Sequence, residues 1–180
     1  MPVEQTLDVA VGDITMKMFV CAPDSDGPAP AVLVGHAWAG QSEFEKNKAR
    51  QVSQLGYVGV AMDLYGDAKT GGSVEENSAL MQPLLENRGE LQARLHASLA
   101  AAAALESVDG AKIGAMGYCF GGLCALDLAR SGADVRGVIS LHGLFVPADN
   151  LDKPQIAAKV LALHGWDAPM VKPDQVLALA

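Results

Sequence analysis

The hydrophobic positions of this chain gather in short continuous runs that longer amphipathic segments separate. A short apolar run bounded by turn residues is typical of a strand that is buried on both faces, as in a parallel sheet. The segments that we expect to form such strands are 31–35, 57–62, 113–116, 135–141 and 158–163.

The N-terminal segment has a different pattern. Residues 4–10 and 14–20 alternate loosely between apolar and polar side chains on either side of Val11-Gly12-Asp13. This alternation around a turn predicts a hairpin.

Capping residues predict helices between the strands. A capping box at 42–45 opens a helix that Gly56 ends. The stretch 73–108 is expected to be helical, with breaks near Pro83 and Gly89. Alternating strands and helices over 1–180 predict one α/β domain with a doubly wound, mostly parallel sheet.

In such sheets the ligand crevice lies at the carboxyl ends of the strands. Several residues with reactive or charged side chains directly follow the predicted strands, so we expect them to gather at one edge of the sheet. They are His36, Asp63, Cys119, His142, His164 and Asp167.

One of these strand ends carries a cysteine between glycines, in Gly117-Tyr118-Cys119-Phe120-Gly121-Gly122. A reactive side chain in this setting is typical of a nucleophile elbow, whose tight turn needs glycine two residues before and after it. The Cys119 sulfur would stand at a helix N-terminus, where free N–H groups favour a thiolate. Cys124, inside the following helix, is expected to be a buried structural residue.

Composition and charge exclude several classes of function. The 180 residues have a formal net charge of −8 and no Lys/Arg-rich run, which argues against nucleic acid and membrane surfaces as partners. No run reaches transmembrane length, and three cysteines without regular spacing indicate a cytoplasmic location. No zinc-ligand pattern is present, so we expect no metal and no cofactor.

Four segments together resemble the dienelactone hydrolase family of α/β-hydrolases: 117–122, His36-Ala37-Trp38-Ala39-Gly40, Asp63-Leu64-Tyr65-Gly66 and His164-Gly165-Trp166-Asp167. The resemblance implies a hydrolase of small esters or lactones that forms a covalent acyl-enzyme. It makes Cys119 the nucleophile and Asp167 the acid of a catalytic triad.

The resemblance also implies roles for residues around the nucleophile. The backbone N–H groups of Trp38 and Phe120 would form an oxyanion hole, which stabilises charge that develops in the tetrahedral intermediate. His36, Tyr118 and Trp166 are expected to line the pocket, and the partner is a small ester or lactone.

The histidines depart from the family pattern. In α/β-hydrolases the triad histidine follows the acid, whereas no histidine follows Asp167 here. We therefore expect the family's last strand, histidine loop and final helix to be absent, and turnover to be impaired. Two alternatives stay open: His36, His142 or His164 acts as a surrogate base, or all three bind a metal with Cys119.

Two further departures concern the substrate. Ala37 stands where dienelactone hydrolases have a glutamate that hydrogen-bonds the resting thiol, and Asp67 stands where an arginine would bind the substrate. A carboxylate at position 67 repels an anionic lactone, so a neutral or differently shaped ester or lactone is expected. The alternative is a non-catalytic α/β-hydrolase-fold module for binding or scaffolding.

The expected loss of the last strand and helix leaves an unpaired sheet edge and an apolar flank. A homo-oligomer that covers this edge is therefore expected.

Overall fold

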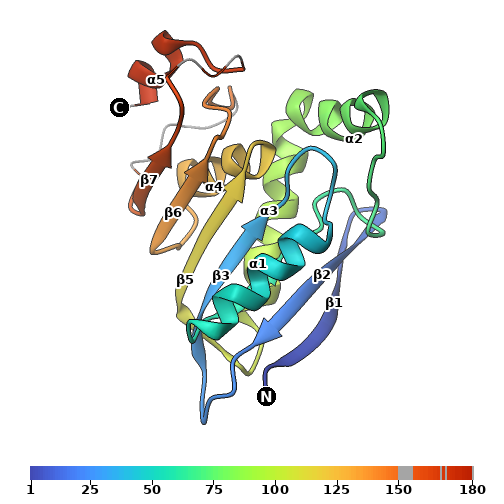
Figure 1. The fold of residues 1–180 in the computed structure, drawn as a ribbon, viewed down its shortest axis with the longest axis vertical. Coiled ribbons are helices and arrows are strands. Elements are labelled where there is room, and N and C mark those ends of the chain that lie inside the picture. Colours follow the sequence, from blue (N-terminus) through green and yellow to red (C-terminus); the bar gives the residue numbers. More distant parts are fainter. Residues whose placement is uncertain (150–155, 167, 169, 180) are drawn as a thin grey trace.

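A seven-stranded sheet forms the centre of the fold in a computed structural model that describes residues 1–149, 156–166, 168 and 170–179 (Figure 1). The strands lie in the order β1-β2-β4-β3-β5-β6-β7. Their bounds are β1 Val3–Val11, β2 Ile14–Ala22, β3 Ala29–Gly35, β4 Val58–Ala61, β5 Val108–Tyr118, β6 Gly137–Leu141 and β7 Lys159–Leu163. The helices are α1 Glu43–Gln54, α2 Val74–Glu86, α3 Arg88–Ala103, α4 Phe120–Arg130 and α5 Pro173–Leu179.

The sheet is mixed but mostly parallel. Strands β4, β3, β5, β6 and β7 run parallel, and the antiparallel hairpin β1–β2 joins them through β4. Gly12 has φ +55° in the hairpin turn, a conformation that glycine adopts without strain. The predicted hairpin and the predicted α/β, doubly wound sheet are both confirmed.

Helices cover both faces of the sheet, and the alternation along β4 shows which helix covers which face. Gly59 and Ala61 face α1, where a Cβ on Gly59 would lie 2.1 Å from Ala49 O. Val58 and Val60 belong instead to the core under α3 and α4. The predicted capping box at the start of α1 is confirmed.

Two predicted helix boundaries are wrong. Pro83 lies inside α2 and does not break it, whereas the break that we predicted near Gly89 occurs at Asn87, whose side chain accepts a hydrogen bond from Glu90 N–H at 3.1 Å. Helix α2 ends just before Asn87 and not at Pro83, because the asparagine side chain caps the next helix, whereas the proline removes only one backbone N–H. Helix α3 also ends at Ala103, and Val108 begins β5, because pairing with β3 extends that strand.

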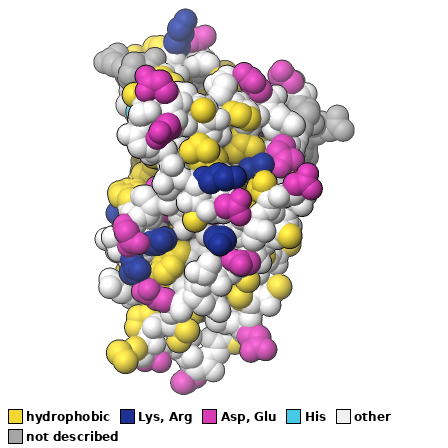
Figure 2. All heavy atoms as spheres, turned by 90° about the vertical axis from the view of Figure 1, so that its right-hand side faces the viewer, with side chains coloured by type: hydrophobic (Ala, Val, Ile, Leu, Met, Phe, Trp, Pro, Cys, Tyr) yellow, Lys and Arg dark blue, Asp and Glu magenta, His cyan; other side chains and the backbone are white. Residues whose placement is uncertain are grey.

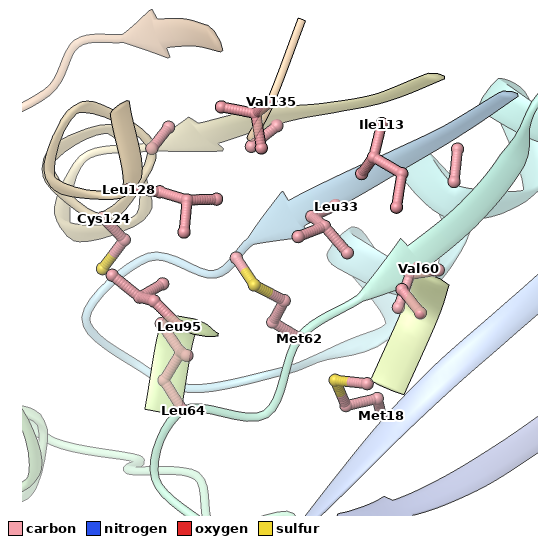
Figure 3. Close-up of a cluster of buried hydrophobic side chains, with 14 of the residues drawn as sticks. Met18, Leu33, Val60, Met62, Leu64, Leu95, Ile113, Cys124, Leu128 and Val135 are labelled. Carbon is pink, nitrogen blue, oxygen red and sulfur yellow. The ribbon is translucent and has the colours of Figure 1, made fainter. Parts of the chain in front are cut away.

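The main core lies between the sheet and helices α3 and α4. Figure 3 shows Met18, Leu33 and Met62 from the sheet side of this cluster, with Leu95 of α3 and Cys124 of α4 closing it. Cys124 has no exposed surface, and burial raises the pKa of its thiol well above the usual value. The predicted structural role of this cysteine is confirmed.

The opposite face of the sheet is only partly covered by the described residues. Helix α1 lies in front of β3 and β4, while no described helix lies in front of β5, β6 and β7 (Figure 1). A groove of about 530 Å³ opens there, and its lining includes Val32, Ile139 and Leu161. Strand β7 ends the sheet, and all five of its residues are exposed.

Charged side chains of both signs are interspersed on the face that Figure 2 shows, and this face carries no extended basic surface. Within the described part of the chain, no helix is long and apolar enough to cross a membrane.

Candidate active site

The residues predicted at one edge of the sheet do gather there. Each of the following stands at or just beyond the carboxyl end of a parallel strand: His36 (β3), Asp63 (β4), Cys119 (β5), His142 (β6) and His164 (β7). The sixth predicted residue, Asp167, lies outside the described residues.

Cys119 forms the turn between the end of β5 at Tyr118 and the start of α4 at Phe120. Its backbone has φ 54° and ψ −112°, a conformation that residues other than glycine rarely adopt. Its N–H donates to Leu141 O at 3.0 Å, which ties the turn to β6. The predicted strand–turn–helix geometry is confirmed, whereas the role of Cys119 as nucleophile stays a prediction.

Glycines are required around Cys119 because α4 begins in backbone contact with two strand ends. A Cβ at Gly117 would lie 2.1 Å from Gly121 O, and a Cβ at Gly121 would lie 2.3 Å from Gly35 O. Real Cβ atoms do not approach backbone this closely. The turn can therefore form in this position only with glycine at both sites, as the sequence indicated.

The Cys119 thiol is half-buried, and burial raises its pKa above the usual value, while the adjacent Phe120 N–H group lowers this pKa by less. The helix N-terminus thus acts in the predicted direction, through Phe120 N–H, but it does not determine the net pKa of the thiol in the resting protein. Loss of hydration around the sulfur outweighs the attraction of the helix N-terminus. At neutral pH the group is a thiol, which must lose a proton before its sulfur can act as a nucleophile.

Hydrogen bonds fix the loop after β3, residues 36–40. The carbonyl oxygen of Ala37 accepts from the His36 ring at 2.7 Å, and the carbonyl oxygen of Trp38 accepts from the Tyr65 hydroxyl at 2.8 Å. Among the described residues, Trp38 N–H has no hydrogen-bond acceptor. Phe120 N–H, the first amide of α4, has no acceptor within its helix either.

His36 uses both ring nitrogens in backbone hydrogen bonds. Its Nδ1–H donates to Ala37 O, and its Nε2 accepts from Leu64 N–H at 3.2 Å. The side chain is fully buried, and this burial lowers the pKa of His36, so the ring is neutral. With no free nitrogen, His36 is unavailable as a base for Cys119, and its expected place in the pocket lining stays a prediction.

The other histidines are not bonded to the cysteine either. His142 is exposed and its ring stacks on that of His164 at 6.0 Å between centroids. The ring of His164 packs on Phe145, and neither of its nitrogens has a partner in the described part of the chain. His96 is exposed on α3 and bonds Ser131. No hydrogen bond joins a described histidine to Cys119 Sγ.

The predicted pocket residues differ in exposure. Tyr118 is half-buried, and its ring meets that of Phe44 edge to face at 5.0 Å. Trp166 is 55% exposed, and the role of its neighbour Asp167 stays a prediction. Asp67, where an arginine was expected from the resemblance, is exposed and pairs with Lys69 at 3.4 Å.

Two residues that hold the backbone of the site could not be identified from the sequence alone. Tyr65 holds the Trp38 carbonyl, and the side chain of Glu45, identified only as a helix cap, accepts from Ala37 N–H at 3.4 Å. Tyr65 lay within a segment used for the resemblance, but its partner is 27 positions away in sequence. Only the fold could reveal that contact.

Metal binding finds no support at this edge. Over the described residues, no group of three or more His, Cys, Asp or Glu side chains could hold a metal ion. The alternative of a metal held by Cys119 and the histidines of the sheet edge is therefore not supported.

Comparison with known proteins shows extensive similarity. Residues 16–180 match the model of the Dienelactone hydrolase family. An uncharacterized protein, K02A2.1 of Caenorhabditis elegans, is 39% identical over 84 residues, which are 46% of this chain and 53% of that protein. A putative carboxymethylenebutenolidase of Methylorubrum extorquens is 24% identical over 87% of this chain and 57% of its own length. The chain thus spans little more than half of these curated relatives.

Solved structures share the fold over nearly the whole chain. A protein named m3DLH superposes with a TM-score of 0.93 at 28% identity, over 99% of this chain and 75% of its own. The dienelactone hydrolase-like promiscuous phosphotriesterase P91, from metagenomic libraries, gives a TM-score of 0.91 at 30% identity, over 99% of this chain and 74% of its own.

Proposed function

Because the chain belongs to the dienelactone hydrolase family, we propose that it hydrolyses small neutral esters or lactones with Cys119 as its nucleophile. The observation that carries this proposal is the strained turn at Cys119, held between two strand ends by glycine contacts. A backbone strain of roughly 1–3 kcal/mol is retained in proteins mainly at functional sites.

The proposed reaction has two steps. After the thiol loses its proton to a solvent base, Cys119 Sγ bonds the ester carbonyl carbon, and the carbonyl π electrons move to the oxygen. The N–H groups of Phe120 and Trp38 would stabilise this oxyanion, each by about 3 kcal/mol. The C=O bond then re-forms, the alcohol oxygen leaves with the bonding electrons and takes a proton from water, and a thioester remains.

In the second step, water hydrolyses the thioester and releases the carboxylic acid and the free thiol. In a catalytic triad the acid orients the imidazole of a histidine, and we propose Asp167 as that acid. No histidine among the described residues is hydrogen-bonded to the sulfur, so we propose that water attacks without an efficient base and that this step is slow.

A burst experiment with p-nitrophenyl acetate tests this function. We expect release of about one p-nitrophenolate per chain in the burst, followed by turnover below ~1 s⁻¹. The burst rate should rise with pH across the neutral range, because burial raises the pKa of the Cys119 thiol.

Two results would count against this expectation. Steady turnover at ~1–1000 s⁻¹ from this chain would show that an efficient base is present. An absent burst together with a thiol inert to iodoacetamide would favour the non-catalytic binding or scaffold module.

The open edge of the sheet supports a second proposal, that two copies of the chain associate through β7. Val160, Leu161 and Leu163 are 43%, 49% and 50% exposed on a strand that has no outer partner among the described residues. Antiparallel pairing of two such strands about Leu161 would place Lys159 opposite Leu163, which keeps the two lysines apart.

Light scattering tests this association. We expect the mass of a dimer at micromolar concentrations and a shift to monomer in the variant Leu161→Glu, because a buried unpaired carboxylate is costly. The matched control Leu177→Glu, at an exposed position of α5, should leave the dimer intact. A monodisperse monomer of the unaltered chain contradicts the proposal.

A further inference from the structure

The His36 ring is a fully buried polar group whose two hydrogen bonds both go to backbone. One fixes the Leu64 amide in the loop after β4, and the other fixes the Ala37 carbonyl in the loop after β3. Burying an imidazole is costly unless its polar atoms are satisfied. The ring therefore acts as a bridge between two loops at the edge of the sheet where Cys119 lies.

The bond to Ala37 has a direct geometric consequence for Trp38. The carbonyl of Ala37 and the N–H of Trp38 belong to one planar trans peptide, in which the two point in opposite directions. A donor that holds the Ala37 oxygen on the buried side therefore turns the Trp38 N–H away from it. That N–H has no acceptor among the described residues.

Tyr65 fixes the next peptide and completes the support. Its hydroxyl donates to Trp38 O at 2.8 Å, and burial raises the pKa of this hydroxyl, so it stays a donor. The Tyr65 ring lies 4.5 Å from the His36 ring and 6.0 Å from the Phe120 ring, and His36 and Phe120 are 5.8 Å apart. Three packed rings thus connect the Trp38 loop to the start of α4.

We propose that His36 and Tyr65 are positioning residues, which hold the Ala37–Trp38 peptide so that Trp38 N–H and Phe120 N–H face the same oxyanion. This inference rests on the proposed function of Cys119. It gives the two aromatic side chains a part in the chemistry although neither of them touches the substrate.

Two probes of the same thiol separate positioning from folding. Acylation by p-nitrophenyl acetate passes through an oxyanion, whereas alkylation by iodoacetamide displaces iodide from a saturated carbon and forms none. Loss of a correctly placed oxyanion donor therefore lowers the first rate and leaves the second unchanged. Both rates are measured on the full chain, with circular dichroism to confirm the fold of every variant.

Paired variants of His36 test the hydrogen bond itself. In His36→Asn the side-chain amide can occupy the place of Nδ1 and donate to Ala37 O, whereas in His36→Gln it reaches the place of Nε2. We expect His36→Gln to lower the acylation rate by about 100-fold, and His36→Asn to recover at least about 10-fold of that loss. The matched controls His96→Asn and His96→Gln should change neither rate.

Tyr65→Phe removes only the hydroxyl and serves also if the His36 variants do not fold. We expect it to lower acylation by about 10-fold with alkylation within about 2-fold of the unaltered chain. Tyr57→Phe, at an exposed tyrosine before β4, is its control and should behave as the unaltered chain.

Each result decides between the two hypotheses. Acylation that is unaffected in Tyr65→Phe, or that falls together with alkylation, overturns the positioning role and leaves the function of Cys119 standing. An unaltered chain that iodoacetamide alkylates but p-nitrophenyl acetate does not acylate overturns the proposed function instead.

Discussion

Replacement of Cys119 by alanine is expected to abolish covalent labelling of the chain by both p-nitrophenyl acetate and iodoacetamide. The other two thiols cannot substitute for it, because Cys21 is 1% exposed and Cys124 has no exposed surface. Burial also raises the pKa of Cys124 well above the usual value, which leaves it protonated and unreactive. Mass measurement of the intact protein after short incubation reports the labelled fraction.

The variants Cys21→Ala and Cys124→Ala are the matched controls for this experiment. Each removes one buried sulfur and leaves the turn at Cys119 intact, so each should be labelled to the same extent as the unaltered chain. Labelling that persists in Cys119→Ala and disappears in one of the controls would place the reactive thiol elsewhere.

The variant Gly121→Ala is expected to lower the free energy of unfolding by about 3 kcal/mol, a large loss for one methyl group. The added Cβ would lie 2.3 Å from Gly35 O and 2.8 Å from His36 O, and both of these are backbone atoms that cannot rotate away. Relief requires α4 to move away from β3. Urea unfolding followed by circular dichroism measures the change.

Gly27→Ala is the control for this prediction. Gly27 lies in the loop before β3, and a Cβ there meets nothing within 4 Å, so its unfolding free energy should change by no more than about 0.5 kcal/mol. Equal stability of the two variants would mean that the contact between α4 and β3 is not tight.

The elbow could be predicted from sequence because its cause is local. Glycines on both sides of Cys119, an apolar run before it and a helical run after it each act within a few residues. The alternation of strands and helices has the same local character, and it yielded the parallel sheet and the hairpin. Where local signals competed, as at Pro83 and Asn87, the stronger cap determined the boundary.

The properties that sequence could not predict arise from tertiary contacts. The raised pKa of the Cys119 thiol results from burial by other segments, which outweighs the effect of the local helix N-terminus. The hydrogen bond between the His36 ring and an amide 28 positions away also has no local signal in the sequence. Tyr65 and Trp38 are likewise brought together only by the parallel pairing of β3 and β4.

These contacts suggest how the fold prepares the chemistry that we propose. Glycine packing sets the direction of α4 and thereby of Phe120 N–H, while the His36 and Tyr65 side chains set the direction of Trp38 N–H. Donors fixed in advance stabilise a developing charge without reorganisation at the moment of reaction. The strain at Cys119 is the cost of placing the sulfur between them.

Peptide mapping of the acetylated chain tests this account most directly. The protein is treated with p-nitrophenyl acetate, quenched in acid during the burst, digested, and analysed by mass spectrometry. The account predicts a single acetyl group, bound as a thioester to the peptide that contains Cys119. Acetyl groups found only on lysine side chains, with the peptide of Cys119 unmodified, would contradict it.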